Sequence, residues 1–461
     1  MSATYDELLA CVRPHRQEHL LSFWHLLTDA ERAHLAAQIQ SLDFSVLEQL
    51  AAPSSSQADR AESPPAVRCN ATDNRFSPEE ARARGEAALR AGEVGMILVA
   101  GGQGTRLGFD HPKGMFAIGP VSGRSLFEII IDRMQAVAAR YQTRIPLLVM
   151  TSPATTAETE AYFIERHHFG LQRDEDLRFF EQGTLPAIDA ETRRVLLADR
   201  HDIALAPDGH GGMLAALARV ITFDALRKQG IKTLFYGQID NPLLTVCDPE
   251  FLGYHLLAQS ELTTQVVRKH DPAERVGVVA AVDGSLQIIE YSDLSPEQAA
   301  RREADGSLTL WAGNTAVHAF AVSFLERVSQ QKAALPLHFA RKKVPYVDEA
   351  GVKIEPTEPN AIKFERFIFD LLPQARDALV VEVERAAAFA PVKNAPGAAS
   401  DTPASAQAAM VALHRSWLEA AGAEVASDIK VEIHPALALD AEALRQRVAR
   451  GTKFNTDTFL Q

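Results

Sequence analysis

The sequence predicts an α/β protein built on a doubly wound, mostly parallel sheet. From residue 94 onward, short β-type segments alternate with helical ones, which is the pattern of such sheets. The first β segment, residues 94–100, is apolar throughout, as expected for a strand buried on both faces. A loop with four glycines follows directly, at Gly101, Gly102, Gly104 and Gly108. Because ligands of these sheets bind beyond the carboxyl ends of the strands, this loop marks the expected site.

The elements divide the chain into three expected parts. Clustered leucines and a capping box at Thr28 to Glu31 predict helices in residues 1–50, and a Ser/Pro-rich linker is expected at residues 52–65. Strands are expected at residues 94–100, 145–150, 177–182, 233–239 and 263–267, and helices at 157–167, 213–228 and 249–259. Residues 397–404 resemble a second flexible connection. The expected parts are a helical domain with linker (1–92), the α/β domain (93–395) and a small C-terminal α/β module (396–461).

Composition restricts the classes of function. A chain of 461 residues with 46% hydrophobic residues is long enough for two or three cores. The net charge of -13 argues against nucleic acid and anionic membrane surfaces as partners. No apolar run approaches the roughly 20 residues that span a bilayer, and the polar N-terminus is unlike a signal peptide, so a cytoplasmic protein is expected. Cys11, Cys69 and Cys247 lack the spacing of a zinc site or a disulfide framework.

The glycine-rich loop has the residues needed to hold a nucleoside triphosphate. Glycines let backbone N–H groups approach an anion closely, and Arg106 and Lys113 add full positive charges. A Walker loop is excluded because no Gly-Lys-Ser or Gly-Lys-Thr closes the segment. A dinucleotide-binding dehydrogenase would need an acidic residue about 20 positions on, where Val121 to Arg124 stand instead. An ordinary turn needs only one or two glycines.

Several further motifs resemble one family in their order along the chain. The loop Ala100-Gly101-Gly102-Gln103-Gly104-Thr105-Arg106-Leu107-Gly108 followed by Pro112-Lys113-Gly114 resembles the UDP-sugar pyrophosphorylases, in particular those that make UDP-N-acetylglucosamine. The similarity extends from about residue 95 to residue 414 through segments that begin at Phe180, Ala206, Val276, Glu290, Ala312, Lys342 and Pro391. The resemblance implies a Rossmann-like nucleotidyltransferase sheet in a catalytic domain at residues 93–395. It implies UTP and a sugar 1-phosphate as substrates.

The resemblance also implies roles for individual residues. Nucleotide contacts are implied for Ala100, Gly101, Gly102, Gln182 and Gly209. Sugar contacts are implied for His210, Gly277, Glu290, Tyr291 and Asn314. Catalytic contacts with the phosphates are implied for Arg106, Lys113 and Lys393. Asp240 ends an expected strand, where a carboxylate fits either a Mg²⁺ ligand or a turn cap, and the resemblance favours Mg²⁺.

The chemistry that follows needs cations rather than a general base. The oxygen of a sugar phosphate is already ionised at neutral pH, and its attack on the α-phosphorus of UTP brings two polyanions together. The protein must align them and neutralise the charge that develops on the phosphoryl oxygens and the leaving pyrophosphate. Arg106, Lys113 and Lys393 are therefore the expected catalytic cations.

One residue departs from the family pattern. His210 stands where the acetylamino-sugar enzymes have asparagine, and histidine here resembles the UDP-glucose and broad-specificity UDP-sugar branches. A UDP-glucose or general UDP-sugar pyrophosphorylase is therefore the main alternative. A nucleotide-sugar sensor without turnover is an alternative of another class, but it would not need Arg106, Lys113, Asp240 and Lys393 together. The sequence leaves the exact sugar, the oligomeric state and regulation open.

Overall fold

The computed structural model describes residues 3–47, 57–69, 71–331 and 335–461. The chain forms two compact units, each assembled from separate stretches of sequence. The small unit comprises Met1–Ser55, Gln182–Ala216 and Ala333–Asp370, and the large unit comprises Ser56–Glu181, Leu217–Lys332 and Leu371–Gln461. Two internal segments therefore join the N-terminal residues in the small unit. The domain boundaries expected from the sequence, at residues 92 and 395, differ from the limits of these two units. They remain a prediction about domains.

Four parallel strands in the order β10-β2-β3-β4 form the part of the large sheet that follows the glycine-loop strand. Their bounds are β2 Val94–Val99, β3 Leu147–Thr151, β4 Leu177–Glu181 and β10 Thr233–Gln238. The chain moves from β2 to β3 and β4, and then returns to the opposite side of β2 as β10. This reversal makes β2 and β10 the switch point of the strand order, and ligands of doubly wound sheets bind beyond the carboxyl ends of the strands at such a point. The predicted fold class and the first four strands are confirmed.

The sheet continues beyond β10 through strands of mixed direction. The long strand β14 (Ala312–Ala321) runs antiparallel to β10, β11 and β12. Beyond β10 its neighbours are β11 (Leu262–Arg268) and β12 (Val278–Val282), which pair in turn with β19 (Leu379–Glu382) and β13 (Ser285–Ile289). Because β14 is antiparallel to β10, the start of β14 lies at the same edge of the sheet as the end of β10. Residues from both halves of the sheet therefore share one edge.

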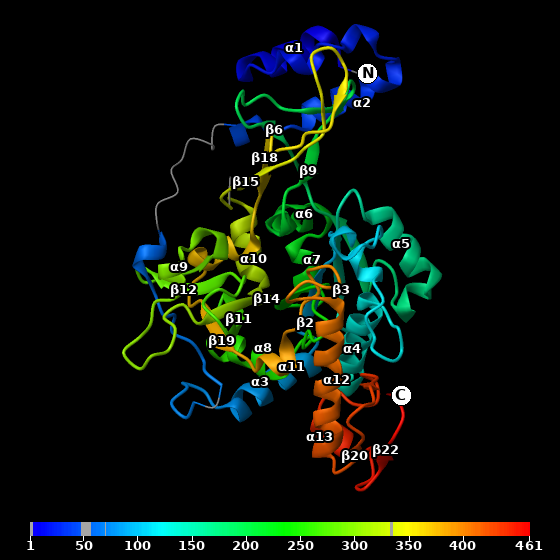
Figure 1. The fold of residues 1–461 in the computed structure, drawn as a ribbon, viewed down its shortest axis with the longest axis vertical. Coiled ribbons are helices and arrows are strands. Elements are labelled where there is room, and N and C mark those ends of the chain that lie inside the picture. Colours follow the sequence, from blue (N-terminus) through cyan, green and yellow to red (C-terminus); the bar gives the residue numbers. More distant parts are fainter. Residues whose placement is uncertain (1–2, 48–56, 70, 332–334) are drawn as a thin grey trace. The chain divides into compact units, whose positions relative to one another are not determined.

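Helices cover both faces of this sheet (Figure 1). Figure 1 shows α3 (Pro78–Arg90) and α8 (Pro249–Leu257) on one side and α7 (Phe223–Lys228) and α10 (Val322–Ser329) on the other. Helix α4 (Leu126–Tyr141) joins α3 and α8 in the main apolar core. The remaining helices of this region are α5 (Thr156–Glu165), α6 (Met213–Val220), α9 (Pro296–Ala299) and α11 (Arg385–Ala388).

The main chains of helices α3 and α8 are in direct contact because each helix has a glycine where it meets the other. A Cβ on Gly253 would lie 1.6 Å from the carbonyl oxygen of Ala81, and a Cβ on Gly85 would lie 1.8 Å from that of Pro249. No side-chain rotation relieves an overlap with main-chain atoms. Glycine is therefore required at both positions for this helix pair to reach its observed separation.

The small unit combines the N-terminal helices with four short sheets in its described residues. Helices α1 (Tyr5–Val12) and α2 (Asp29–Ser41) confirm the predicted helical start, and Thr28 and Glu31 form the predicted capping box. Their apolar side chains share a core with residues from the later segments, including Leu185, Ile203 and Phe364. The strands are β5 Thr184–Pro186, β6 Ile188–Asp189, β7 Leu197–Asp199, β8 Asp202–Ile203, β9 Leu205–Pro207, β15 His338–Lys342, β16 Tyr346–Val347, β17 Lys353–Ile354 and β18 Ala361–Glu365.

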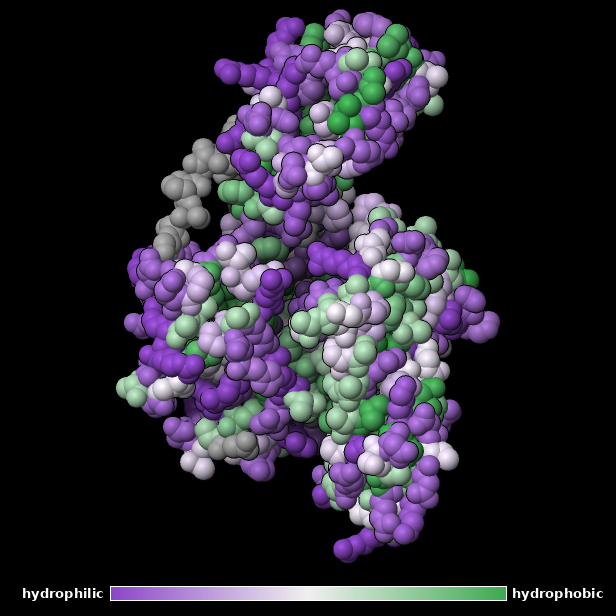
Figure 2. All heavy atoms as spheres, in the orientation of Figure 1, coloured by the Kyte–Doolittle hydropathy of each residue, from purple (hydrophilic) through white to green (hydrophobic). Residues whose placement is uncertain are grey.

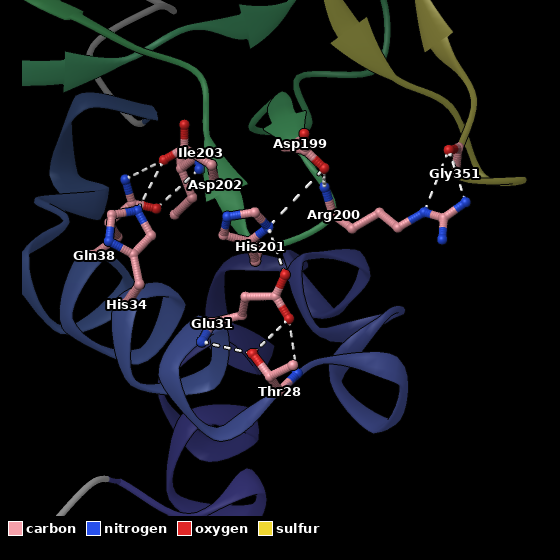
Figure 3. A network of polar contacts seen from close by, with 10 residues as sticks. All are labelled: Thr28, Glu31, His34, Gln38, Asp199, Arg200, His201, Asp202, Ile203 and Gly351. Atoms are coloured by element: carbon pink, nitrogen blue, oxygen red, sulfur yellow. Dashed lines mark hydrogen bonds and ion pairs between the residues drawn. The ribbon is translucent and has the colours of Figure 1, made fainter.

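Polar contacts fasten α2 to the β7–β8 hairpin inside the small unit (Figure 3). The Gln38 amide donates to Asp202 Oδ1 at 2.6 Å, and its Oε1 accepts from the Ile203 N–H at 2.9 Å. Asp202 Oδ1 also accepts from His34 Nε2 at 3.0 Å. The Gln38 side chain thus bonds both the Ile203 N–H and the Asp202 carboxylate of the hairpin. These bonds attach α2 to the segment at residues 182–216.

The C-terminal residues add a small α/β layer to the large unit. Helix α12 (Pro403–Ala420) contributes Ala406 and Met410 to the main core, and Leu418 near its end belongs to a separate local cluster. That cluster is completed by the strand pairs β20–β22 and β21–β23 and by α13. The bounds are β20 Glu424–Val425, β21 Val431–Ile433, α13 Ala441–Arg445, β22 Lys453–Phe454 and β23 Thr458–Leu460.

Two expectations about local structure were wrong. The single helix expected at residues 213–228 is two helices, because the Thr222 side chain accepts from the Ala225 N–H and starts α7 anew. Part of the expected linker is a strand, β1 (Ala61–Glu62), which pairs with β12 and buries Ala61. The residues of that linker at 52–56 lie outside the described residues. The strand was missed because two residues carry no periodic pattern.

Hydrophilic side chains predominate on the face shown in Figure 2, with hydrophobic side chains in smaller patches between them. The most exposed large apolar side chains are Leu26, Ile164, Val352 and Phe339. Among the described residues, no helix combines the length and apolar character needed to cross a bilayer.

The contact between α3 and α8 predicts that Gly253→Ala destabilises the protein. Overpacking against main-chain atoms costs about 3 kcal/mol, which exceeds the ~1 kcal/mol that alanine gains over glycine in a helix. The midpoint of thermal unfolding should therefore fall. Ala83→Leu adds bulk to an exposed position of α3 and serves as the control. An unchanged midpoint for Gly253→Ala would contradict the packing described here.

Candidate active site

The glycine-rich loop leaves the carboxyl end of β2 and is held open by main-chain hydrogen bonds. The N–H of Lys113 donates to Gly102 O at 3.0 Å, and that of Gly104 donates to His111 O at 2.8 Å. The Ser152 hydroxyl, just after β3, donates to Gly101 O at 2.8 Å. The loop therefore has a fixed base, with Lys113 at its end. Ala100 is buried against β3, to which its N–H is bonded.

The loop is open to its surroundings at Gly102. A Cβ on Gly102 would meet no atom within 4 Å, so the backbone borders open space at this point. Arg106 lies in a short 3₁₀ turn, Thr105–Leu107, and is exposed. Gly108 ends the turn with φ of 72°, a conformation that favours glycine. Arg106 is thus an accessible cation beside an open backbone segment, as an anion site requires.

Lys113 and Asp240 meet at the reversal between β2 and β10. Asp240 is the second residue after the end of β10, and Lys113 Nζ lies 3.8 Å from Asp240 Oδ2. Each of the two side chains is 15% exposed. Lys113 Nζ also donates to Val392 O at 3.3 Å, and the Val392 N–H donates to Asp240 O at 2.8 Å. The segment carrying Lys393 is therefore tied to the same point by two hydrogen bonds of Val392.

Lys393 stands at the start of a closed turn. Its N–H donates to Asp401 O at 2.8 Å, and its ammonium lies 5.8 Å from the centre of the Phe389 ring. The turn fixes the backbone of Lys393 while the side chain stays partly exposed. The predicted catalytic residues Lys113 and Lys393 are thus joined through Val392 and Asp240.

The residues expected to bind the sugar converge at the same edge of the sheet. Gly277 precedes β12, and its carbonyl accepts from the Asn314 N–H at 2.8 Å. Glu290 follows β13, and a Cβ on Gly277 would lie 2.9 Å from Glu290 Oε1. Asn314 Oδ1 accepts from the Ala316 N–H at 3.0 Å, which fixes the orientation of its amide. Tyr291 is 46% exposed at the start of the next turn.

The other three expected ligand contacts belong to the small unit. Gln182 is buried. Gly209 has φ of 83°, and a Cβ there would lie 2.5 Å from Arg366 O, so the position needs glycine on two counts. The Gly211 N–H donates to the same carbonyl at 2.8 Å. These contacts press the loop around His210 closely against the strand end at Arg366.

His210 is held as a neutral ring with one orientation. Its Nδ1 accepts from the Ile368 N–H at 3.2 Å, and the ring stacks on Phe367 with centroids 5.3 Å apart. Burial, with a smaller contribution from the charge of His338, lowers the pKa of His210 to about 4. The proton of the neutral ring must sit on Nε2, because Nδ1 is an acceptor. His210 is therefore a hydrogen-bond donor at neutral pH and does not serve as a base.

The structure thus gathers most of the predicted residues in one unit. Eleven of the fourteen lie in the large unit, and Gln182, Gly209 and His210 lie in the small unit. Sequence reasoning missed Ser152, which fixes the Gly101 carbonyl, and Asp401, which closes the turn at Lys393. Ser152 follows an expected strand end, which was a usable signal. Asp401 lay in a stretch that resembled a flexible connection.

Asp240 is the residue suited to hold a metal ion. Among the described residues, no three His, Cys, Asp or Glu side chains form a metal-binding group. Mg²⁺ commonly takes one or two protein carboxylates and completes its octahedral shell with phosphate oxygens and water. A partly exposed carboxylate 3.8 Å from Lys113 Nζ fits that requirement.

Comparison with known proteins identifies the family of the chain. The family described as UTP--glucose-1-phosphate uridylyltransferase matches residues 44–443 of the chain. The chain belongs to this family, the UDP-sugar pyrophosphorylases. Family membership confirms the resemblance seen in the sequence and makes the protein a uridylyltransferase.

Individual members of the UDP-sugar pyrophosphorylase family are similar over most of their length. The UDP-N-acetylglucosamine pyrophosphorylase of Saccharomyces cerevisiae is 40% identical, with 78% of this chain and 76% of the relative covered. UDP-N-acetylhexosamine pyrophosphorylase-like protein 1 of Homo sapiens is 36% identical, with 91% and 87% covered. The crystal structure of the uridine diphosphate N-acetylglucosamine pyrophosphorylase from Trypanosoma brucei in complex with inhibitor has a TM-score of 0.82 and 31% identity, with 97% and 95% covered.

The positions of the two loop cations predict large losses of turnover on their removal. Arg106→Ala and Lys113→Ala should each lower kcat by about 10²-fold, since both cations would stabilise transition-state charge. Pyrophosphate release under saturating substrates measures the effect. Arg376→Ala removes an exposed arginine elsewhere in the large unit and should leave kcat unchanged. Near-normal turnover of a folded Arg106→Ala or Lys113→Ala variant would refute the assigned role.

Proposed function

We propose that the protein is a Mg²⁺-dependent enzyme that forms UDP-N-acetylglucosamine, or a related UDP-N-acetylhexosamine, and pyrophosphate. Its substrates would be UTP and the corresponding N-acetylhexosamine 1-phosphate. The observation that carries the proposal is the group formed by Lys113, Asp240 and the Lys393 segment at the reversal between β2 and β10. The relatives at 36–40% identity, a UDP-N-acetylglucosamine pyrophosphorylase and a UDP-N-acetylhexosamine pyrophosphorylase-like protein, support the acetylated sugar.

The reaction would be a direct displacement at phosphorus. An oxygen of the sugar phosphate forms a bond with the α-phosphorus of UTP, and the bond from that phosphorus to the β-bridging oxygen breaks. Its electron pair leaves with pyrophosphate, so no external proton donor or acceptor is needed. Lys113, Arg106 and Lys393 would hold the two anions in line and balance the charge on the oxygens.

Asp240 would hold Mg²⁺ beside Lys113, and the bound ion would neutralise phosphate charge. The remaining roles belong to the protein's own groups. The backbone at Gly102 borders open space, and the main chain of Gly101 and Gly102 would lie against the nucleotide. The Gln182 amide can both donate to and accept from the edge of uracil, which distinguishes uracil from bases with another donor pattern.

The sugar would be recognised at the sheet edge that carries Gly277, Glu290 and Asn314. A carboxylate, a fixed amide and main-chain groups suit a ligand with many hydroxyls. Glu290 can accept from hydroxyl groups, and the Asn314 Nδ2 group remains a donor because its Oδ1 is already bonded to Ala316. This division of donors and acceptors favours a neutral, polyhydroxylated ring carrying an amide.

A second candidate is a UDP-glucose or general UDP-sugar pyrophosphorylase. His210 favours it, because the enzymes with asparagine at this place act on acetylamino sugars. The ring donates a hydrogen bond only through Nε2, whereas an asparagine amide donates and accepts. A sensor without turnover is disfavoured, since a binding protein has no need of the full set of phosphate-facing cations.

We further propose that the enzyme works in the cytoplasm without nucleic acid or membrane partners. Free thiols at Cys11, Cys69 and Cys247 support a reducing compartment. The net charge of -13 supports the absence of polyanionic partners.

Pyrophosphate release from UTP and Mg²⁺ with four sugar phosphates tests the proposal. N-acetylglucosamine, N-acetylgalactosamine, glucose and galactose 1-phosphates should be compared at equal concentration. We expect the acetylated substrates to have the higher kcat/KM. A higher kcat/KM for glucose or galactose 1-phosphate would move the enzyme to the second candidate. UTP binding without pyrophosphate from any sugar would identify a sensor.

The role of His210 in sugar choice has its own test. His210→Asn should raise the kcat/KM ratio of N-acetylglucosamine 1-phosphate over glucose 1-phosphate by about tenfold, the value of one well-placed hydrogen bond. His25→Asn changes an exposed histidine of the small unit and is the matched control. A ratio equal to that of the control would remove His210 from the specificity argument.

A further inference from the structure

Asn241, the residue after Asp240, is a buried amide that the chemistry described above does not use. It is 3% exposed. Its Nδ2 donates to Ala388 O at 2.7 Å, and its Oδ1 accepts from the Ala390 N–H at 3.1 Å. Oδ1 also accepts from the Leu243 N–H at 3.2 Å. The side chain therefore joins two main-chain segments that are distant in sequence.

The bonds to Ala388 and Ala390 hold the main chain on both sides of Phe389. Phe389 is extended, with φ of -145° and ψ of 105°, so the carbonyl before it and the N–H after it face the same side. A primary amide carries the same donor and acceptor as a peptide group, so Asn241 binds this segment as a neighbouring strand would. Aspartate lacks the donor and an apolar side chain lacks both groups. The contact is therefore specific to an amide side chain.

The segment that Asn241 holds carries Lys393. The centre of the Phe389 ring lies 5.8 Å from Lys393 Nζ, which is within the range of a cation–π contact. The Val392 N–H donates to Asp240 O at 2.8 Å. In the described part of the chain, the Asn241 amide makes two of the three hydrogen bonds that join this segment to Asp240 and Asn241. The position of Lys393 relative to Asp240 therefore depends on the Asn241 side chain.

We propose that Asn241 is a positioning residue for Lys393 in the uridylyltransferase reaction. Its amide holds the segment that carries the lysine against Asp240, so that the ammonium group meets the phosphates beside this carboxylate. The inference rests on the proposed function, because it needs Lys393 to act on the phosphates. A fixed backbone reduces the freedom that the lysine must lose when substrate binds. A misplacement of about 1 Å can lower a rate by about 10²-fold.

Asn241→Ala removes the amide and leaves the segment attached through Val392. We expect kcat to fall roughly tenfold with the KM for UTP nearly unchanged, as for a misplaced catalytic cation. Pyrophosphate release is measured on the full-length enzyme with saturating Mg²⁺ and the sugar 1-phosphate that the unaltered enzyme turns over fastest. An unchanged kcat in the folded variant would overturn the proposal.

Asn74→Ala is the matched control in the same unit. Asn74 Oδ1 accepts from the Arg68 N–H at 3.0 Å, and Asn74 Nδ2 donates to Arg68 O at 2.9 Å, so this variant also loses an amide that is paired with main chain. Both substitutions should lower the unfolding midpoint, whereas only Asn241→Ala should lower kcat. Equal losses of kcat would reduce Asn241 to a structural role. If Asn241→Ala does not fold, Asn241→Ser, which retains a hydroxyl acceptor for the Leu243 N–H, is judged by the same criteria.

Dependence on Lys393 is tested by double-mutant cycles. If Asn241 acts through Lys393, Asn241→Ala should have no further effect on kcat in a Lys393→Ala background. In an Arg106→Ala background the two losses should multiply, because Arg106 belongs to the separate glycine-rich loop. Multiplicative losses in the Lys393→Ala background would refute the positioning role.

Amide hydrogen exchange tests the same contact without turnover. The peptide that contains Ala390 and Val392 should exchange severalfold faster in Asn241→Ala than in the unaltered enzyme, and Asn74→Ala should leave it unchanged. Unchanged exchange in Asn241→Ala would refute the inference even in an active enzyme. Failure of the proposed function is seen in the unaltered enzyme, as absent pyrophosphate release or preference for another sugar. Failure of this inference is seen only in the ratios between variants.

Discussion

The large unit must hold two negatively charged substrates together at one edge of its sheet. UTP and a sugar phosphate repel each other, so the protein must supply fixed cations and dipoles where the two meet. The return of the chain from β4 to β10 creates that place, because the chains leaving β2 and β10 end there side by side. Lys113 reaches it from the glycine-rich loop, and Asp240 reaches it from β10. Val392, next to Lys393, is hydrogen-bonded to both residues.

Close packing of main chain makes the arrangement rigid. Gly253 and Gly85 let α3 and α8 approach at distances that any Cβ would prevent, and Gly209 does the same against Arg366 in the small unit. The phosphate-side segments are held by main-chain hydrogen bonds, such as those from Lys113 to Gly102 and from Lys393 to Asp401. The long side chains of Lys113 and Lys393 thus extend from backbone segments that are held by hydrogen bonds. This lowers the entropy cost of ordering these side chains when substrate binds.

Much of the fold could be predicted from the sequence. The apolar strand 94–99 and the strands that follow it have strong local patterns, and each was found within a few residues of its observed bounds. Weak patterns failed. The β1 strand of two residues gains its stability by pairing with β12, and the break between α6 and α7 depends on one threonine cap. No local sequence pattern indicates that residues 182–216 and 333–370 join the N-terminal residues in one unit, because this association results from contacts between residues distant in sequence.

The sequence by itself determined the family and the types of reactive residue, since motif residues such as Arg106, Lys113 and Asp240 can be recognised from their local sequence alone. Only the tertiary structure decided which of these groups meet, which ring nitrogen of His210 carries the proton, and which residue closes the turn at Lys393. The neutral state of His210 depends on burial and on the Ile368 N–H, 158 positions away. The turn at Lys393 is closed by the main-chain carbonyl of Asp401, which no side-chain pattern reports. Residue types are local properties, whereas protonation, strain and proximity are set by groups that only the fold brings together.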